Sequence, residues 1–267
     1  MARDILDEII ENKRTELIRQ KQAVSPAELR TRIMEREPCP KGCRSLRAAL
    51  SQSKSGIIAE FKRKSPSKGW IHPEAKVADV LPTYERSGAA ACSILTDRDF
   101  FGGSLGDLRE ARSLVKLPLL RKDFIIDPYQ IDQALLAGAD AILLIAAALS
   151  PDQYDELADQ AHEAGLEVLL EIHDEAELDY IRPNTDVVGI NNRHLGSFHT
   201  DVATSFQLAS LLPEDMVKIS ESGLSDGATI RRLREAGFRG FLVGESLMRH
   251  VEPGDALAAL IQEIVCE

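Results

Sequence analysis

Two patterns of hydrophobic and polar positions divide the chain near residue 50. Before that point, apolar residues recur at the three- and four-residue spacing of amphipathic helices. After it, short apolar runs alternate with amphipathic segments. We therefore expect a helical extension over residues 1–50, packed on a larger domain over residues 51–267. The apolar stripe of the first helix consists of Ile5, Leu6, Ile9, Ile10, Leu17 and Ile18.

The extension is expected to contain three helices. Ser25 is placed to cap the second, with Pro26 in its first turn and Glu28 three residues after the cap, as in a capping box. The segment Pro-Cys-Pro-Lys-Gly at 38–42 interrupts this helix, and a third short helix is expected at 45–50. The apolar stripe of the first helix could bind a partner helix, but packing on this chain's own domain is the preferred interpretation.

The second region contains eight short apolar runs that are expected to form strands. Their starts lie 19 to 34 residues apart, which leaves room for a crossover segment after each run. We expect helices to end at the glycines at 88, 138, 165 and 237. We expect helices to begin at Ser150 and at the pair Ser225-Asp226. Pro82 is expected to kink or shorten the helix that contains it. The runs span 57–63, 91–97, 118–124, 141–147, 167–173, 186–192, 217–223 and 240–246.

Eight β-α units favour an α/β fold of the (β/α)8, or TIM, barrel type. The alternative is an open, doubly wound parallel sheet. Such a sheet usually carries a glycine-rich phosphate loop after its first strand, and the segment Arg-Lys-Ser-Pro-Ser at 63–67 is not such a loop.

Amino-acid composition limits the possible binding partners and the expected cellular compartment of the protein. A net charge of -11 argues against non-specific nucleic-acid binding, but a few local donors could still hold a phosphorylated small molecule. The four cysteines do not form a disulfide framework, and Cys39 and Cys43 lack the further ligands of a zinc site. No apolar run has membrane-spanning length and no signal-peptide core is seen, so we expect a cytoplasmic protein without membrane contact. A monomer or a weak homodimer is expected, since the helical stripe could pack internally or between subunits.

Charged residues in the first run suggest a functional site. Side chains alternate along a strand, so Glu60 and Lys62 share one face while Phe61 and Arg63 share the other. Opposite charges on a short apolar strand are costly to bury without a partner or a ligand. The alternative is a surface ion pair on an edge strand.

Polar residues recur late in other runs, on the same face as an earlier apolar residue or glycine. Active sites of (β/α)8 barrels lie at the C-terminal ends of the strands, where these side chains would converge. The pairs are Lys122 with Leu120, Glu171 with Leu169, and Asn191 and Arg193 with Gly189.

The last two runs end in glycine-containing segments, Glu-Ser-Gly at 221–223 and Gly-Glu-Ser at 244–246. Loops after the seventh and eighth barrel strands commonly bind phosphate, because glycine lets the backbone approach and free N–H groups favour an anion. Ser65 and Ser67 on the first loop could close over the phosphate. Taken singly, Gly223 and Gly244 would more often be turn residues, but together at these two strand ends they favour a phosphate site.

At these positions the chain resembles the indole-3-glycerol phosphate synthase family. Glu245 stands where some members of that family carry serine, a harmless change if only its backbone N–H takes part. The shared motifs are AEFK at 59–62 with SPSKG at 65–69, LTD at 95–97 with FGGS at 101–104, LRKDF at 120–124, LLI at 143–145, EIH at 171–173, GINNR at 189–193, ESG at 221–223 and LVGESLM at 242–248.

The resemblance implies a reaction without metal or cofactor on 1-(2-carboxyphenylamino)-1-deoxyribulose 5-phosphate. The ring carbon that bears the carboxylate attacks the ketone, and carbon dioxide and then water leave. Lys122 would be the general acid and Glu171 the base for dehydration. Lys62 would hold the substrate carboxylate and is a candidate to protonate the leaving hydroxyl. Glu60 would position the lysines.

The resemblance also implies the substrate contacts. Asn191 would orient the sugar hydroxyls and Arg193 would hold the ion network at the mouth. Ser65, Ser222, Gly223, Gly244 and Glu245 would bind phosphate, with Ser67 closing over it. Phe101, Phe124 and Leu143 would wall the anthranilate ring, although ordinary core packing explains each of them equally well. His173 is taken as a hydrogen-bonded support.

Two other functions stay open from the residues alone. A phosphoribosyl isomerase of the same barrel type would need a carboxylate or thiol acid–base pair, whereas this site offers two lysines and two glutamates. A non-catalytic sugar-phosphate-binding barrel would need no acid–base set at all.

Overall fold

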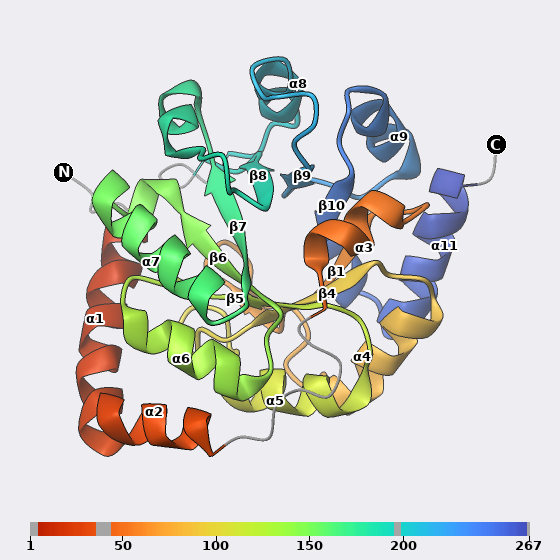
Figure 1. Ribbon diagram of the computed structural model, residues 1–267. Coiled ribbons are helices and arrows are strands. Elements are labelled where there is room, and N and C mark those ends of the chain that lie inside the picture. Colours follow the sequence, from red (N-terminus) through yellow and green to blue (C-terminus); the bar gives the residue numbers. More distant parts are fainter. Residues whose placement is uncertain (1–4, 36–43, 195–198, 266–267) are drawn as a thin grey trace.

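The computed structural model of this protein describes residues 5–35, 44–194 and 199–265 (Figure 1). Within them, eight parallel strands close into a barrel in the order β1-β10-β9-β8-β7-β6-β5-β4. Each strand falls inside one of the eight predicted runs, so the (β/α)8 barrel is confirmed and the open sheet is wrong. The strands are β1 Ile57–Phe61, β4 Ala91–Leu95, β5 Leu119–Lys122, β6 Ala141–Ile145, β7 Glu167–Ile172, β8 Val187–Asn191, β9 Lys218–Glu221 and β10 Gly240–Val243.

Side-chain alternation divides the barrel strands between two hydrophobic clusters. Leu120, Leu169 and Ile219 belong to the cluster that fills the barrel. Their strand neighbours Leu119 and Leu170 belong to the cluster between the barrel and the surrounding helices. Because neighbouring strand residues face opposite sides, a residue two positions after Leu120, Leu169 or Ile219 also points into the barrel.

Helices cover the outside of the barrel between successive strands (Figure 1). All four predicted glycine stops are left-handed, with φ from 77° to 93°. Ser150 and Asp226 cap α7 and α9 as predicted. Pro82 does not shorten its helix, because α4 continues through it to Arg86. The helices are α4 Val77–Arg86, α5 Leu105–Leu114, α6 Pro128–Ala137, α7 Pro151–Glu163, α8 Ala203–Ala209, α9 Gly227–Glu235, α10 Glu245–Met248 and α11 Pro253–Val265, with 3-10 helices at Ala146–Ala148 and Glu175–Tyr180.

The N-terminal segment forms α1 Ile5–Ala23, α2 Pro26–Met34 and α3 Leu46–Gln52, which lie against the barrel and its helices (Figure 1). Leu6, Ile9 and Ile10 of the predicted stripe join the cluster inside the barrel, whereas Ile18 is 60% exposed. The stripe therefore packs largely on this chain's own barrel. The predicted break at 38–42, with Cys39 and Cys43, lies outside the described residues.

Ser25 caps α2 as predicted, since its Oγ accepts a hydrogen bond from the Glu28 backbone N–H at 3.2 Å. The Glu28 carboxylate instead accepts from Arg32, at 2.6 Å, one turn further along the helix. The predicted capping box is thus only half formed, because a cationic partner at i+4 competes for the glutamate. Among the described residues, no helix has both the length and the apolarity to cross a bilayer.

Candidate active site

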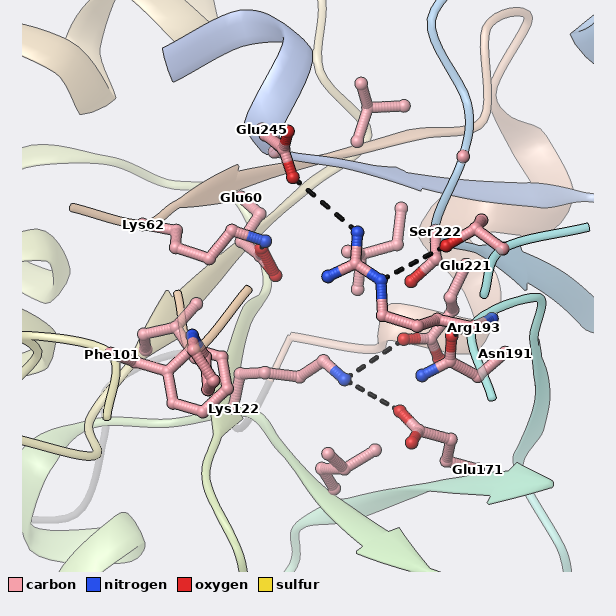
Figure 2. Close-up of a pocket in the computed structure, with 18 of the residues that line it drawn as sticks. Glu60, Lys62, Phe101, Lys122, Glu171, Asn191, Arg193, Glu221, Ser222 and Glu245 are labelled. Atoms are coloured by element: carbon pink, nitrogen blue, oxygen red, sulfur yellow. Dashed lines mark hydrogen bonds and ion pairs between the residues drawn. The ribbon is translucent and has the colours of Figure 1, made fainter. Parts of the chain in front are cut away.

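A cavity of about 410 Å³ lies at the C-terminal ends of the barrel strands. It is lined by every predicted site residue except Ser65 and Ser67. Figure 2 shows side chains converging on it from three strands: Glu60 and Lys62 from the end of β1, Lys122 from β5 and Glu171 from β7. Each of these polar side chains lies on the same strand face as an apolar residue deeper in the barrel, which explains why they meet at one end.

Lys122, at the end of β5, lies between two carboxylates. Its Nζ is 2.8 Å from Glu171 Oε2 of β7 and 3.0 Å from Glu221 Oε2 of β9. Burial alone would lower the pKa of Lys122, but the two carboxylates outweigh it and raise that pKa above its ordinary value. The amine is therefore held as an ammonium ion that can donate a proton.

The two carboxylates on Lys122 differ in their other contacts. Glu171 Oε1 lies 3.3 Å from His173 Nε2, so both of its oxygens face a cation. Burial would raise the pKa of Glu171, but Lys122 and His173 lower it below its usual range. Burial raises the pKa of Glu221 to about 7, with Glu171 adding to the rise. Glu221 Oε1 is buried and has no hydrogen-bond partner among the described residues.

His173 is held between Glu171 and Glu177, whose Oε2 lies 3.3 Å from the His173 Nδ1. Burial would lower the pKa of His173, but the contacts with the Glu171 and Glu177 carboxylates raise it to about 10. The ring is accordingly an imidazolium support behind Glu171.

Glu221 is a site residue that the sequence analysis missed. It follows Ile219 by two positions on β9, and Ile219 belongs to the cluster inside the barrel. The rule that selected Lys122 and Glu171 would have selected Glu221 as well.

Glu60 and Lys62 form an ion pair at the end of β1, with Lys62 Nζ 2.7 Å from Glu60 Oε2. Glu60 is 3% exposed and β1 pairs with β4 and β10, so the alternative of a surface pair on an edge strand is wrong. Lys62 and Lys122 line the same cavity.

Two sources outside the barrel strands supply part of the apolar wall of the cavity. Phe101 and Phe124 follow β4 and β5, and their ring centroids lie 5.9 Å apart. The other source is α1, which contributes Ile5, Leu6 and Ile9. The helical stripe gave no signal of this role, because its spacing predicts burial and not the element it is buried against. The barrel strands add Leu95, Leu143, Ile145, Leu242 and Val243 to the apolar lining.

Glycine positions and a strained serine lie at the ends of β9 and β10. Ser222 has φ of 67° and Gly223 has φ of 75°, the left-handed region that favours glycine. A Cβ on Gly244 would lie 2.6 Å from Glu60 Oε2, so only glycine fits beside the ion pair. These segments bring backbone to the cavity wall.

Arg193 crosses the mouth of the cavity toward the same end (Figure 2). Its Nη2 lies 3.6 Å from Glu245 Oε2, and Glu245 also pairs with Arg249. The Arg193 backbone N–H donates to Asn191 Oδ1 at 3.0 Å, which fixes the amide of Asn191. The side chain of Glu245 thus takes part in the ion network, beyond the backbone contact expected at this position.

Ser65 and Ser67 of the first loop do not line the cavity, although Arg193 at its mouth donates from Nη1 to Ser67 Oγ at 3.5 Å. Ser65 pairs with Gly69 in a short hairpin, β2 Lys64–Ser65 and β3 Gly69–Trp70, which folds the loop back on itself. Ser65 is 1% exposed, with an Oγ that lacks a partner among the described residues, and Ser67 is exposed. The loop lines the cavity with Pro66 and Lys68 instead.

In the described part of the chain, no group of three or more His, Cys, Asp or Glu side chains is arranged to hold a metal ion. The polar groups of the cavity include two lysines, an arginine and the carboxylates that form ion pairs with them. Acid–base groups at the C-terminal ends of the strands define a (β/α)8-barrel enzyme.

Residues 6–260 match the family described as indole-3-glycerol phosphate synthase. The chain belongs to this family. It is 57% identical to the indole-3-glycerol phosphate synthase of Bacteroides thetaiotaomicron over 262 residues, which cover 98% of this chain and 99% of that protein. The enzyme of the same name from Magnetococcus marinus is 44% identical, with 98% and 100% covered.

Among solved structures, the tryptophan synthase subunit alpha from Legionella pneumophila superposes with a TM-score of 0.59 and 16% sequence identity. The match covers 82% of this chain and 96% of that one. At this identity the likeness concerns the barrel fold alone.

Proposed function

We propose that this chain is an indole-3-glycerol phosphate synthase, which converts 1-(2-carboxyphenylamino)-1-deoxyribulose 5-phosphate to indole-3-glycerol phosphate. The ring carbon that bears the carboxylate attacks the ketone, carbon dioxide leaves to restore the aromatic ring, and water is then eliminated. The observation that carries the proposal is Lys122 between Glu171 and Glu221 in the same cavity as the Glu60–Lys62 pair.

Lys122 is the general acid of this proposal. The attacked ketone oxygen gains negative charge, and an ammonium group held in a confined site can donate a proton to it. The carboxylates that keep Lys122 protonated also fix its direction. Glu171, whose low pKa leaves it ionised, is the base that removes a proton during dehydration.

Lys62 is positioned by Glu60 to hold the substrate carboxylate until carbon dioxide leaves, and it is the second candidate proton donor for the hydroxyl that is lost. The apolar wall of Phe101, Phe124 and Leu143 suits the flat anthranilate ring. A ring held against this apolar wall, with its carboxylate on Lys62, would have its reacting carbon oriented toward the ketone.

The phosphate end of the substrate belongs beside Ser222, Gly223, Gly244 and the backbone of Glu245. These residues lie at the cavity end where the last two strands finish, and Arg193 brings a cation to the same end. Asn191, fixed by the Arg193 backbone N–H, orients the sugar hydroxyls between the phosphate and the acid–base groups.

The decisive experiment incubates the purified protein with the carboxyphenylamino substrate and follows indole fluorescence. We expect fluorescence to rise in proportion to enzyme concentration. A protein that gives no indole signal but isomerises an aminoribosyl phosphate would be a phosphoribosyl isomerase instead. The matched mixture of two lysines with carboxylates favours the synthase.

The variant Lys122→Met tests the remaining possibility, a barrel that only binds a sugar phosphate. The synthase predicts a fall in kcat of about 10²–10⁴-fold while the affinity for a phosphate-bearing product analogue is largely kept. A wild-type protein that binds the analogue and shows no turnover would support the binding protein. A monomer or weak homodimer in the cytoplasm stays the prediction from the sequence.

A further inference from the structure

Lys13 of α1 makes a second buried ion cluster behind the active site. Its side chain is 2% exposed, and its Nζ lies 2.9 Å from Asp123 Oδ1, 3.0 Å from Asp97 Oδ2 and 2.7 Å from Glu16 Oε2. A lysine buried this fully is rare without such partners. Asp97 and Asp123 come from the segments that follow β4 and β5, at the catalytic end of the barrel.

Asp123 is the point at which this cluster meets the catalytic residues, because it lies between Lys122 and Phe124 in the chain. Its Oδ1 accepts from the Phe124 backbone N–H at 2.8 Å as well as facing Lys13. Its Oδ2 accepts from Thr96 Oγ1 at 2.5 Å and from Arg121 at 3.0 Å. Asp123 itself lines the cavity, but Lys13, Thr96 and Arg121 do not, so the turn that carries Lys122 and Phe124 is held by groups outside the cavity.

Asp97 fixes the neighbouring loop in the same way. Its Oδ1 accepts from the Phe100 backbone N–H at 2.9 Å, and its carbonyl oxygen accepts from Gly103 at 2.7 Å, so the turn around Phe101 closes on it. Lys13 therefore contacts both loops that supply the facing rings of Phe101 and Phe124.

We propose that Lys13 is a positioning residue for the reaction, because it ties the loop of Phe101 and the turn of Lys122 and Phe124 to helix α1. The inference rests on the proposed function in one respect, the role of Lys122 as general acid. The same helix contributes Ile5, Leu6 and Ile9 to the cavity wall, so the tie sets the distance between this wall and the acid. Without the Lys13 ammonium, Asp97 would lose the cation at its Oδ2 and Asp123 would keep only Arg121. Repulsion between the two buried carboxylates would then separate the two loops.

The test compares three variants with wild type by steady-state fluorescence and by thermal melting. Lys13→Met removes the tie, and we expect kcat to fall about 10–100-fold with a smaller change in KM, since a displacement of the acid by about 1 Å has an effect of this size. Lys21→Met is the matched control, because Lys21 lies on the same helix and pairs with Asp127 at 2.6 Å at the surface. We expect its kcat to stay within about twofold of wild type.

The double variant Lys13→Met/Asp97→Asn separates positioning from folding. Asparagine removes one of the two unbalanced charges and can keep the hydrogen bond to the Phe100 backbone N–H. We expect it to recover at least about fivefold in kcat over Lys13→Met, measured well below both melting temperatures.

Either of two results would overturn the inference: a folded Lys13→Met enzyme with kcat within about twofold of wild type, or a double variant no faster than the single one. A wild-type protein without turnover would instead reject the proposed function itself, so the two failures are distinguishable.

Discussion

Two buried lysines, Lys13 and Lys122, lie near the end of β5, and each contacts carboxylates at about 3 Å. They differ in whether the side chain is accessible from the cavity. Lys13 is 2% exposed and lies outside the cavity, whereas Lys122 is 13% exposed and lines it. On the Lys13 side, both oxygens of Asp123 accept hydrogen bonds from neighbouring groups. On the Lys122 side, Glu221 keeps one oxygen without a partner in the described part of the chain.

The difference shows how equal burial gives opposite acid–base behaviour. Burial would raise the pKa of Asp123, but Lys13 and Arg121 lower it to about 2. Glu221 shares a single lysine with Glu171, so burial prevails and its pKa rises to about 7. Asp123, held by two cations outside the cavity, is therefore a structural anion, whereas Glu221, which shares its cation with Glu171, can exchange a proton near neutral pH.

The largest expected effect comes from Glu171→Gln on the catalytic side. The amide cannot take up a proton, so we expect kcat to fall about 10²–10⁴-fold, measured by indole fluorescence at saturating substrate. Glu177→Gln is the control, since Glu177 contacts the other side of His173 and does not line the cavity. A Glu171→Gln enzyme that keeps a tenth of the wild-type kcat would show that Glu171 is not the base.

On the structural side, Asp123→Ala should lower the free energy of unfolding by about 3–5 kcal/mol, because it leaves Lys13 and Arg121 buried without their shared anion. The folded pKa of Asp123 is lowered, so its contribution is present above the ordinary carboxyl value and is lost as pH falls through about 2. Urea unfolding at pH 7 and pH 3 should show a smaller difference between variant and wild type at the lower pH.

Asp155→Ala is the reference for that measurement. Asp155 pairs with Arg182 at 2.8 Å but is 46% exposed, so the loss should stay below about 1 kcal/mol. Equal losses for Asp123→Ala and Asp155→Ala would contradict the importance of the buried cluster.

Glu221→Gln should change how stability depends on pH. The folded pKa of Glu221 is raised, so its contribution is present below the ordinary carboxyl value and is lost as pH rises through about 7. The free energy of unfolding of the variant relative to wild type should therefore increase by about 1–3 kcal/mol between pH 4 and pH 8. Denaturant unfolding at both pH values measures this difference, and a decrease would mean that Glu221 ionises readily in the folded protein.

The smallest effect is expected for stability in Lys21→Met. Lys21 and Asp127 are 35% and 28% exposed, so solvent screens their ion pair and its loss should cost about 0–1 kcal/mol. Adding salt to wild type should reduce even this difference. A loss as large as that of Asp123→Ala would remove the distinction between the surface and buried pairs of α1.

Most of the barrel and much of its site follow from local sequence features. Strand alternation and the length between runs are properties of short segments, so they predicted eight strands and placed Glu60, Lys122 and Glu171 inside one end. The same alternation rule also places Glu221, two positions after Ile219, inside that end. Local pattern therefore determined which face a residue takes.

Only the tertiary structure decided which groups meet. The pairing of Lys122 with two carboxylates depends on strands far apart in sequence, and α1 reaches the cavity through packing that its stripe did not specify. The hairpin that withdraws Ser65 from the cavity depends on pairing within the loop. Side-chain periodicity fixes direction along one element, but contacts depend on distances between elements, and these are set only when the whole barrel closes.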